Sequence, residues 1–138
     1  VVDRLRAGKK ANWFHSTRHH HSFTFTPDAG KATAILGNDP RAYGQVWHLP
    51  TAADPPTGAG WVEAIAGELG APARVQVAGK GLVRIMGAFV PVMREFSELM
   101  YQWDRDYIFD SSRFEKTYGF APTPYSEGIK AVANALPR

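Results

Sequence analysis

The sequence contains no cysteine, which excludes disulfide bonds and thiolate chemistry. It also has no apolar run long enough to cross a bilayer as a helix. Both absences are compatible with the reducing cytoplasm, where we expect the protein to reside without a membrane partner.

A third absence concerns dinucleotide cofactors, whose pyrophosphate is held by a glycine-rich turn between a strand and a helix. The paired glycines at residues 58–60 and 79–81 are short turns outside such a strand–turn–helix unit. We therefore expect no cofactor to bind to this chain alone.

What is present is typical of a folded domain, since 44% of the residues are hydrophobic and 21% are charged. A chain of 138 residues can bury one compact core, so we expect residues 1–138 to form a single domain. The net charge is +3, and basic residues gather early, at Arg4, Arg6, Lys9, Lys10 and Arg18. Because no aromatic–basic pattern accompanies them, we interpret them as solvated charges and expect no nucleic-acid partner.

Apolar periodicity and turn residues predict alternating helices and strands. Strands are expected at residues 12–14, 21–26, 44–49, 73–78 and 107–109. Helices are expected at residues 1–6, 27–36, 57–69, 82–89, 92–103, 111–118 and 124–136. This mixed order is typical of the α/β or α+β class.

Capping residues support several of these helix boundaries. Asp28 can cap the second helix or lie in its first turn, and Asp110 is a strong N-cap for a later one. Gly70 and Gly119 are suitable C-terminal stops. The last helix is expected to bury three apolar side chains, those of Ile129, Val132 and Leu136.

Three segments follow one another in the order typical of one enzyme family. They are residues 21–29 (HSFTFTPDA), 44–50 (GQVWHLP) and 110–128 (DSSRFEKTYGFAPTPYSEG). They resemble, in turn, an aromatic strand with an Asp-opened helix, the last strand of a central sheet, and a closing Asp-Ser helix with a Pro-Thr turn. In this order and spacing, the chain resembles the C-terminal portion of the NAD-dependent epimerase/dehydratase family, the extended short-chain dehydrogenases.

The resemblance implies an α/β fold made of the last central-sheet strand and a small mixed α/β substrate-binding subdomain. The Rossmann half that binds NAD or NADP in the parent enzyme would be a missing N-terminal partner, as the start of the chain within a predicted helix also suggests. The implied function is substrate binding in an epimerase/dehydratase or reductase that acts on a nucleoside-diphosphate sugar or related small molecule. The alternative is a stand-alone module that binds a small molecule or associates with itself and has no enzymatic activity.

The chemistry of this family rests on a Tyr-x-x-x-Lys pair, in which the Lys lowers the pKa of the proton-transferring Tyr. The residues four positions after the five tyrosines are Trp47, Arg105, Ser111, Pro122 and Ile129. None of them is lysine. We therefore expect no catalytic residue in this chain and no activity from it in isolation.

The resemblance implies five candidates for substrate contact: Asn12, Phe14, His21, Phe23 and Arg105. His21 stands where sugar-nucleotide enzymes often carry an Arg that meets the substrate diphosphate, and a protonated His can still meet an anion. Phe23 stands at an aromatic position, and Arg105 is the residue nearest to a second family Arg. The competing interpretation places Phe14 and Phe23 in the core and Arg105 in a surface ion pair with Asp104, Asp106 or Glu98.

Two further patterns remain. Four histidines within seven residues, at His15, His19, His20 and His21, raise a metal-site hypothesis, but no carboxylate or thiolate stands at matching spacing, so we favour a polar loop. The strand predicted at residues 44–49 would belong inside the sheet of the missing domain. Its edge and Trp47 would then be exposed, which predicts homo-oligomers.

Overall fold

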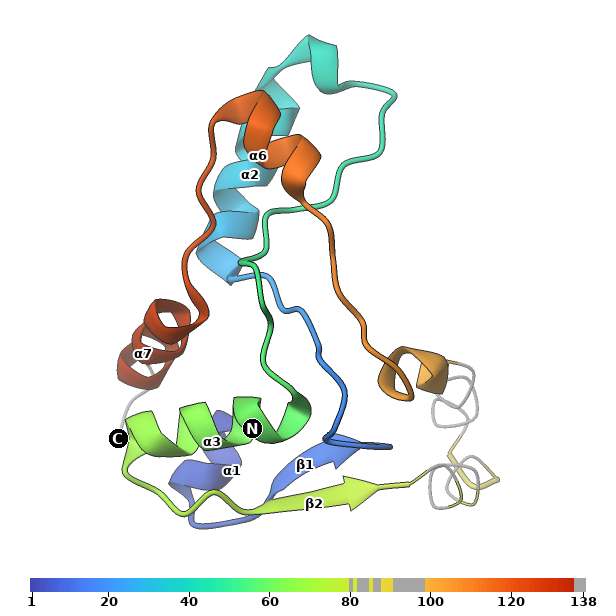
Figure 1. The fold of residues 1–138 in the computed structure, drawn as a ribbon, viewed down its shortest axis with the longest axis vertical. Helices are drawn as coiled ribbons and strands as arrows, with labels where there is room; N and C mark the ends of the chain where they lie inside the picture. The colour runs from blue at the N-terminus through green and yellow to red at the C-terminus, as the bar shows by residue number, and fades with distance from the viewer. Residues whose placement is uncertain (80, 82–84, 86–87, 91–98, 136–138) are drawn as a thin grey trace. The chain divides into compact units, whose positions relative to one another are not determined.

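The computed structural model describes residues 1–79, 81, 85, 88–90 and 99–135. The chain forms two compact units, each built from segments that are distant in the sequence. The first comprises Val1–His21, Pro56–Tyr107 and Ile129–Arg138, and the second comprises Ser22–Pro55 and Ile108–Gly128. The mixed α/β class is confirmed, because the described residues form five α-helices and a two-stranded parallel sheet (Figure 1). None of these helices is long and apolar enough to cross a membrane.

The first unit contains the sheet. Its elements are α1 (Val2–Arg6), β1 (Ala11–Phe14), α3 (Gly58–Leu69), β2 (Val75–Ala78) and the 3₁₀ helix η2 (Leu99–Trp103). β1 and β2 run parallel, with Ala11 opposite Val75, which confirms the strands predicted in these two segments. Parallel strands need a crossover connection, and α3 is the helix that directly precedes β2. In Figure 1, α1 and α3 lie next to each other beside the strands.

The boundaries of α3 agree with the prediction. The Thr57 hydroxyl accepts a hydrogen bond from the Gly60 amide at 3.2 Å and caps the N-terminus. Gly70 ends the helix in the left-handed conformation, with a φ of 62°. The face that carries Trp61 and Val62 is buried, as the apolar spacing indicates.

α3 approaches β1 closely because Gly58 has no side chain. A Cβ atom at this position would lie 2.5 Å from Cε2 of Trp13. The Trp13 ring is buried and meets the Trp103 ring edge-on, with centroids 5.5 Å apart. The packing around Trp13 therefore requires a glycine at the first position of α3.

The second unit has its core at Phe114, which is 1% exposed. Its elements are α2 (Thr26–Asn38), the 3₁₀ helix η1 (Pro40–Ala42), α6 (Ser112–Tyr118) and the start of α7 (Tyr125–Ala135). The Phe114 ring contacts the rings of Trp47, Tyr118 and Phe120. The helices predicted at residues 27–36 and 111–118 are confirmed, and Gly119 ends α6 with a φ of 61°.

The strands predicted at residues 21–26, 44–49 and 107–109 are wrong. His21 and Tyr107 form only an isolated bridge, and residues 22–25 lead without regular structure into α2. In the described part of the chain, residues 44–49 pair with no strand, so the implied last strand of a central sheet is not formed. Alternating side chains do not make a strand where no neighbour supplies ladder hydrogen bonds.

Two helix starts also differ from the prediction. The N-cap of α6 is Ser111 rather than Asp110, whose carboxylate accepts a hydrogen bond from the Ser112 amide at 2.9 Å. α7 begins at Tyr125, one residue later than predicted.

The burial predicted for the last helix is only partly correct. Ile129 is half-buried, but Val132 is 39% exposed because α7 turns Gly128 and Ala133 inward. Leu136 lies outside the described residues, as do most residues of the helices predicted at 82–89 and 92–103. The last five residues of the second of these, Leu99–Trp103, form the 3₁₀ helix η2.

Candidate functional site

Two of the five residues predicted to meet a substrate lie against one indole ring in the first unit. His21 is buried and stacks on Trp103, with ring centroids 4.4 Å apart, and lies 5.3 Å from the Tyr107 ring. Phe14 is half-buried and meets the same indole at 5.7 Å. The His21 imidazole therefore belongs to an aromatic cluster rather than to an open surface.

Asn12 and Arg105 lie in the same unit but take part in other contacts. The Asn12 carboxamide oxygen accepts a hydrogen bond from Nε2 of Gln76, its neighbour across the sheet, at 2.7 Å. Arg105 is an exposed partner of Asp104, with Nε 2.8 Å from the carboxylate, and this bond raises the pKa of Arg105. The geometry of Arg105 is that of a surface ion pair.

Phe23 belongs to the second unit and is 41% exposed. It is thus not a core residue. Phe14 and His21, two of the five candidates, share Trp103 as a neighbour.

The histidine-rich loop is organised by Asp106. The carboxylate of Asp106 accepts the His20 amide at 2.8 Å and lies 3.7 Å from Nδ1 of His19. Within the described ranges, no group of three or more His, Asp or Glu side chains is arranged to hold a metal ion.

The first strand does not lead into a dinucleotide site. After β1 the chain continues through His15, with a φ of 55°, and stays without helix until Thr26. A dinucleotide needs a glycine-rich turn and a helix N-terminus at this point. The residues that follow β1 therefore do not fit NAD or NADP.

The three segments that carry the family resemblance meet in the second unit. Asp28 lies in the first turn of α2, where its buried carboxylate accepts the Thr123 amide at 2.7 Å and makes no cap bond. The Ser111 hydroxyl accepts the Thr51 amide at 3.0 Å. In both cases a backbone amide in an irregular segment donates a hydrogen bond to a buried side chain. These bonds join residues that are 60 or more positions apart.

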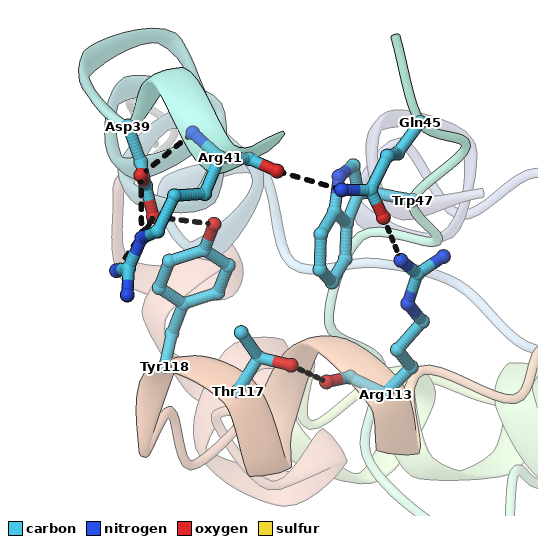
Figure 2. Close-up of a pocket in the computed structure, with 7 residues that line it drawn as sticks. All are labelled: Asp39, Arg41, Gln45, Trp47, Arg113, Thr117 and Tyr118. Carbon is cyan, nitrogen blue, oxygen red and sulfur yellow. Dashed lines mark hydrogen bonds and ion pairs between the residues drawn. The ribbon is translucent and has the colours of Figure 1, made fainter. Parts of the chain in front are cut away.

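The second unit also contains a pocket of about 260 Å³ (Figure 2). Its lining residues come from the cap residue between α2 and η1, from η1, from the irregular segment that follows η1, and from α6. They are Asp39, Arg41, Gln45, Trp47, Arg113, Thr117 and Tyr118.

On one side of this pocket, the Asp39 carboxylate accepts hydrogen bonds from two other lining residues. The carboxylate accepts three kinds of bond: from the Arg41 backbone amide at 3.0 Å, from the Arg41 guanidinium at 2.9 Å and from the Tyr118 hydroxyl at 3.0 Å. The bonds from Arg41 hold the pKa of Asp39 at about 2, below its usual 3.8. Partial desolvation raises the pKa of Tyr118, and its bond to Asp39 raises it further.

Arg113 forms the opposite side of the pocket. Its guanidinium carbon lies 4.1 Å from the centroid of the Trp47 ring, and Nη1 donates to the Val46 carbonyl at 3.2 Å. Nη2 donates to Oε1 of Gln45, whose Nε2 donates to the Arg41 carbonyl. Figure 2 shows this chain of bonds, with Gln45 connecting the two arginine residues.

The lining residues suit binding rather than proton transfer. They include no His, Lys or Cys, and the one carboxylate is held ionised by its donors. A raised pKa keeps the Tyr118 hydroxyl protonated, so it acts as a donor to Asp39.

Sequence reasoning did not identify this pocket. One local signal could have pointed to it, because an Asp before Pro often accepts the amide two residues later, as Asp39 does from Arg41. The contact of Arg113 with Trp47 joins residues 66 positions apart, and no local pattern reports it.

A scan against models of protein families found no match for this chain, and neither did searches among curated proteins and solved structures.

Proposed function

We propose that the chain is the substrate-binding C-terminal portion of an NAD(P)-dependent epimerase/dehydratase or reductase, acting on a nucleoside-diphosphate sugar or a related small molecule. The observation that carries this proposal is the packing of the three family-like segments into one unit. Residues 44–50 and 110–128 belong to the second unit, as does the first segment from Ser22 onward, whereas His21, the first residue of that segment, belongs to the first unit.

The contacts between these segments involve the residues that carry the resemblance. Asp28, the helix-opening acid of the first segment, holds Thr123 of the Pro-Thr turn. His48 of the second segment lies 3.0 Å, through Nδ1, from the carbonyl of Asp110, which opens the third. Trp47 packs on Phe114 and Arg113 of the closing helix. Such mutual contacts give a physical reason for these residue types to occur together.

The proposal assigns the cofactor to a separate partner. The chain lacks the glycine-rich turn and the Tyr-x-x-x-Lys pair, so a Rossmann domain would have to supply NAD or NADP and the proton-transfer residues. This chain would contribute substrate contacts, with His21 able to meet an anion only when protonated. The buried stack of His21 on Trp103 would have to open for such a contact.

The test begins with the coding sequence upstream of Val1 in the same reading frame. We expect it to encode a glycine-rich strand–turn–helix unit followed by a Tyr-x-x-x-Lys pair. The protein produced from the whole frame should oxidise or reduce NAD(P)(H) with a sugar nucleotide or a related substrate, and the 138-residue chain alone should not. A reading frame that lacks either motif, or a whole protein that binds neither NAD nor NADP, would contradict the proposal.

A stand-alone self-associating module is the second candidate, and one observation favours it. Val46 is 81% exposed and Tyr43 is 60% exposed, next to a segment that pairs with no strand among the described residues. The apolar contribution of Trp47 is smaller than predicted, because its ring is half-buried. Sedimentation equilibrium tests this candidate: a concentration-dependent dimer that Val46→Asp abolishes supports it, and a monomer at every concentration contradicts it.

A further inference from the structure

We propose that the pocket of the second unit binds a small molecule that carries a carboxylate or phosphate group on a flat, apolar body. The oxyanion would lie on the guanidinium of Arg113, and the body would lie against the rings of Trp47 and Tyr118. The pocket shares no residue with the five positions implied for substrate contact, so this inference is independent of the proposed function.

The guanidinium of Arg113 is held in place before any ligand binds. It stacks on Trp47 at 4.1 Å and donates one hydrogen bond from each of its terminal nitrogens, to Val46 and to Gln45. A guanidinium has five N–H donors, so three remain for an oxyanion. An arginine that is already stacked and bonded loses little conformational entropy when it forms a bidentate contact.

The positive charge of Arg113 is not neutralised by a neighbouring acid. Across the part of the chain that the structure describes, no carboxylate lies within ion-pair distance of Arg113. Asp39, the acid of the pocket, pairs instead with Arg41 at 2.9 Å and also accepts the Tyr118 hydroxyl. The lining therefore carries two positive charges and one negative charge, and its surplus lies at Arg113.

The aromatic rings offer apolar surface rather than polar groups. The Tyr118 hydroxyl is bonded to Asp39, and the Trp47 indole nitrogen donates to the Ala42 carbonyl at 3.1 Å. The two ring centroids lie 5.6 Å apart, at an angle of 57°. The Arg113 guanidinium covers part of the Trp47 ring, so a flat ligand body would lie against the remaining carbon surface of the two half-buried rings.

The size of the pocket limits the ligand. Its volume of about 260 Å³ is slightly below the range of roughly 300–1,000 Å³ that holds drug-sized molecules. A single ring with one oxyanion is of a size that this volume can hold.

The inference is tested by titrating the ¹⁵N-labelled chain with sodium benzoate and with sodium phenyl phosphate, at constant pH and with sodium chloride keeping the ionic strength constant. The signals to follow are the indole N–H of Trp47 and the Nε–H of Arg113. We expect saturable shifts of both, with a Kd on the order of 1 mM. Tighter binding of benzoate would identify a carboxylate ligand, and tighter binding of phenyl phosphate a phosphate ligand.

Titrations with acetate and with inorganic phosphate measure how much the aromatic ring of the ligand adds to the affinity of its charged group. Because they lack the apolar body, each should bind at least about fivefold more weakly than its aromatic counterpart. Equal affinities would overturn the claim that Trp47 and Tyr118 hold the ligand body.

Matched variants of α6 test the role of Arg113. Arg113→Gln should weaken binding about tenfold or more, because a charge-assisted hydrogen-bond pair is lost. Lys116→Gln removes the same charge from the same helix but not from the pocket lining, and it should change the affinity less than about twofold. Arg113→Lys keeps the charge without the planar fork and should give an intermediate loss.

Three results would overturn the inference. They are the absence of saturable shifts with either aromatic anion, shifts centred on residues outside the pocket, and equal losses in Arg113→Gln and Lys116→Gln. The dispersed indole signals of the other three tryptophans report whether each variant is folded. If Arg113→Gln does not fold, Arg113→Lys takes its place in the comparison with Lys116→Gln.

Discussion

The two units hold their chain segments together by different means. In the first unit the backbone pairs with the backbone: β1 with β2, and His20 with Thr57 in an isolated bridge. In the second unit buried side chains accept backbone amides, as Asp28 does for Thr123. Irregular segments can therefore be joined without strand pairing where a buried side chain supplies the hydrogen-bond acceptor.

Truncating the core of the second unit should cost the most stability. Phe114 is 1% exposed and lies among three aromatic rings, so Phe114→Ala should lower the free energy of unfolding by about 3–5 kcal/mol. Val46→Ala, at a side chain of the same unit that is 81% exposed, should change it by less than about 0.5 kcal/mol. Urea unfolding followed by circular dichroism measures both. Similar midpoints for the two variants would show that Phe114 is not the centre of this unit.

Two glycines of α3 should respond to alanine substitution with changes of opposite sign in the free energy of unfolding. Gly58→Ala would place a Cβ 2.5 Å from the Trp13 ring, and we expect a loss of about 1–3 kcal/mol in the free energy of unfolding. Gly67→Ala, with no atom within 4 Å of the new Cβ, should stabilise the same helix by about 0.5–1 kcal/mol. If thermal unfolding shows that both substitutions stabilise the protein, α3 does not pack on β1 as described.

The side-chain acceptors of the second unit can be tested at Asp28. Asp28→Ala leaves the Thr123 amide without its acceptor, and we expect the free energy of unfolding to fall by about 1–3 kcal/mol. Asp28→Asn keeps an acceptor oxygen of the same shape and should lose less. Equal losses in the two variants, measured by urea unfolding, would mean that the charge of Asp28, rather than its hydrogen bond, is what matters.

The smallest expected effect is a pH dependence at Asp39. The pKa of Asp39 is lowered from 3.8 to about 2 in the folded protein. The ionised carboxylate therefore stabilises the fold above the pKa of the unfolded chain, and this stabilisation is lost as the pH falls through the pKa of the folded protein. Asp39→Asn should therefore flatten the decline of unfolding midpoints between about pH 4 and pH 2. An unaltered slope in Asp39→Asn would contradict the bonds assigned to this carboxylate.

The sequence predicted most of the helices, because apolar spacing and caps are local signals. Thr57 and Gly70 bound α3 as expected, and Gly119 ends α6. Both strands of the observed sheet were also predicted. Their parallel pairing was not, since it depends on a partner more than 60 residues away.

The failures lie where distant residues decide the structure. Residues 44–49 alternate as a strand would, yet Trp47 turns to Phe114 and Arg113, and no strand among the described residues pairs with the segment. The stacking of His21 on Trp103 was likewise not predicted, because it joins residues 82 positions apart. The pocket was missed for the same reason, because Asp39 and Tyr118 are 79 positions apart.

Amide hydrogen exchange of Thr123, Thr51 and Phe109 tests whether the three family-like segments, with the residues that flank them, form one packed unit. These amides lie in segments without helix or strand and donate to side chains of Asp28, Ser111 and Ser22. We expect strong protection of all three amides, and loss of protection at Thr123 in Asp28→Ala. Exchange at the rate of an unstructured peptide would contradict the packing, and with it the observation on which the proposed function rests.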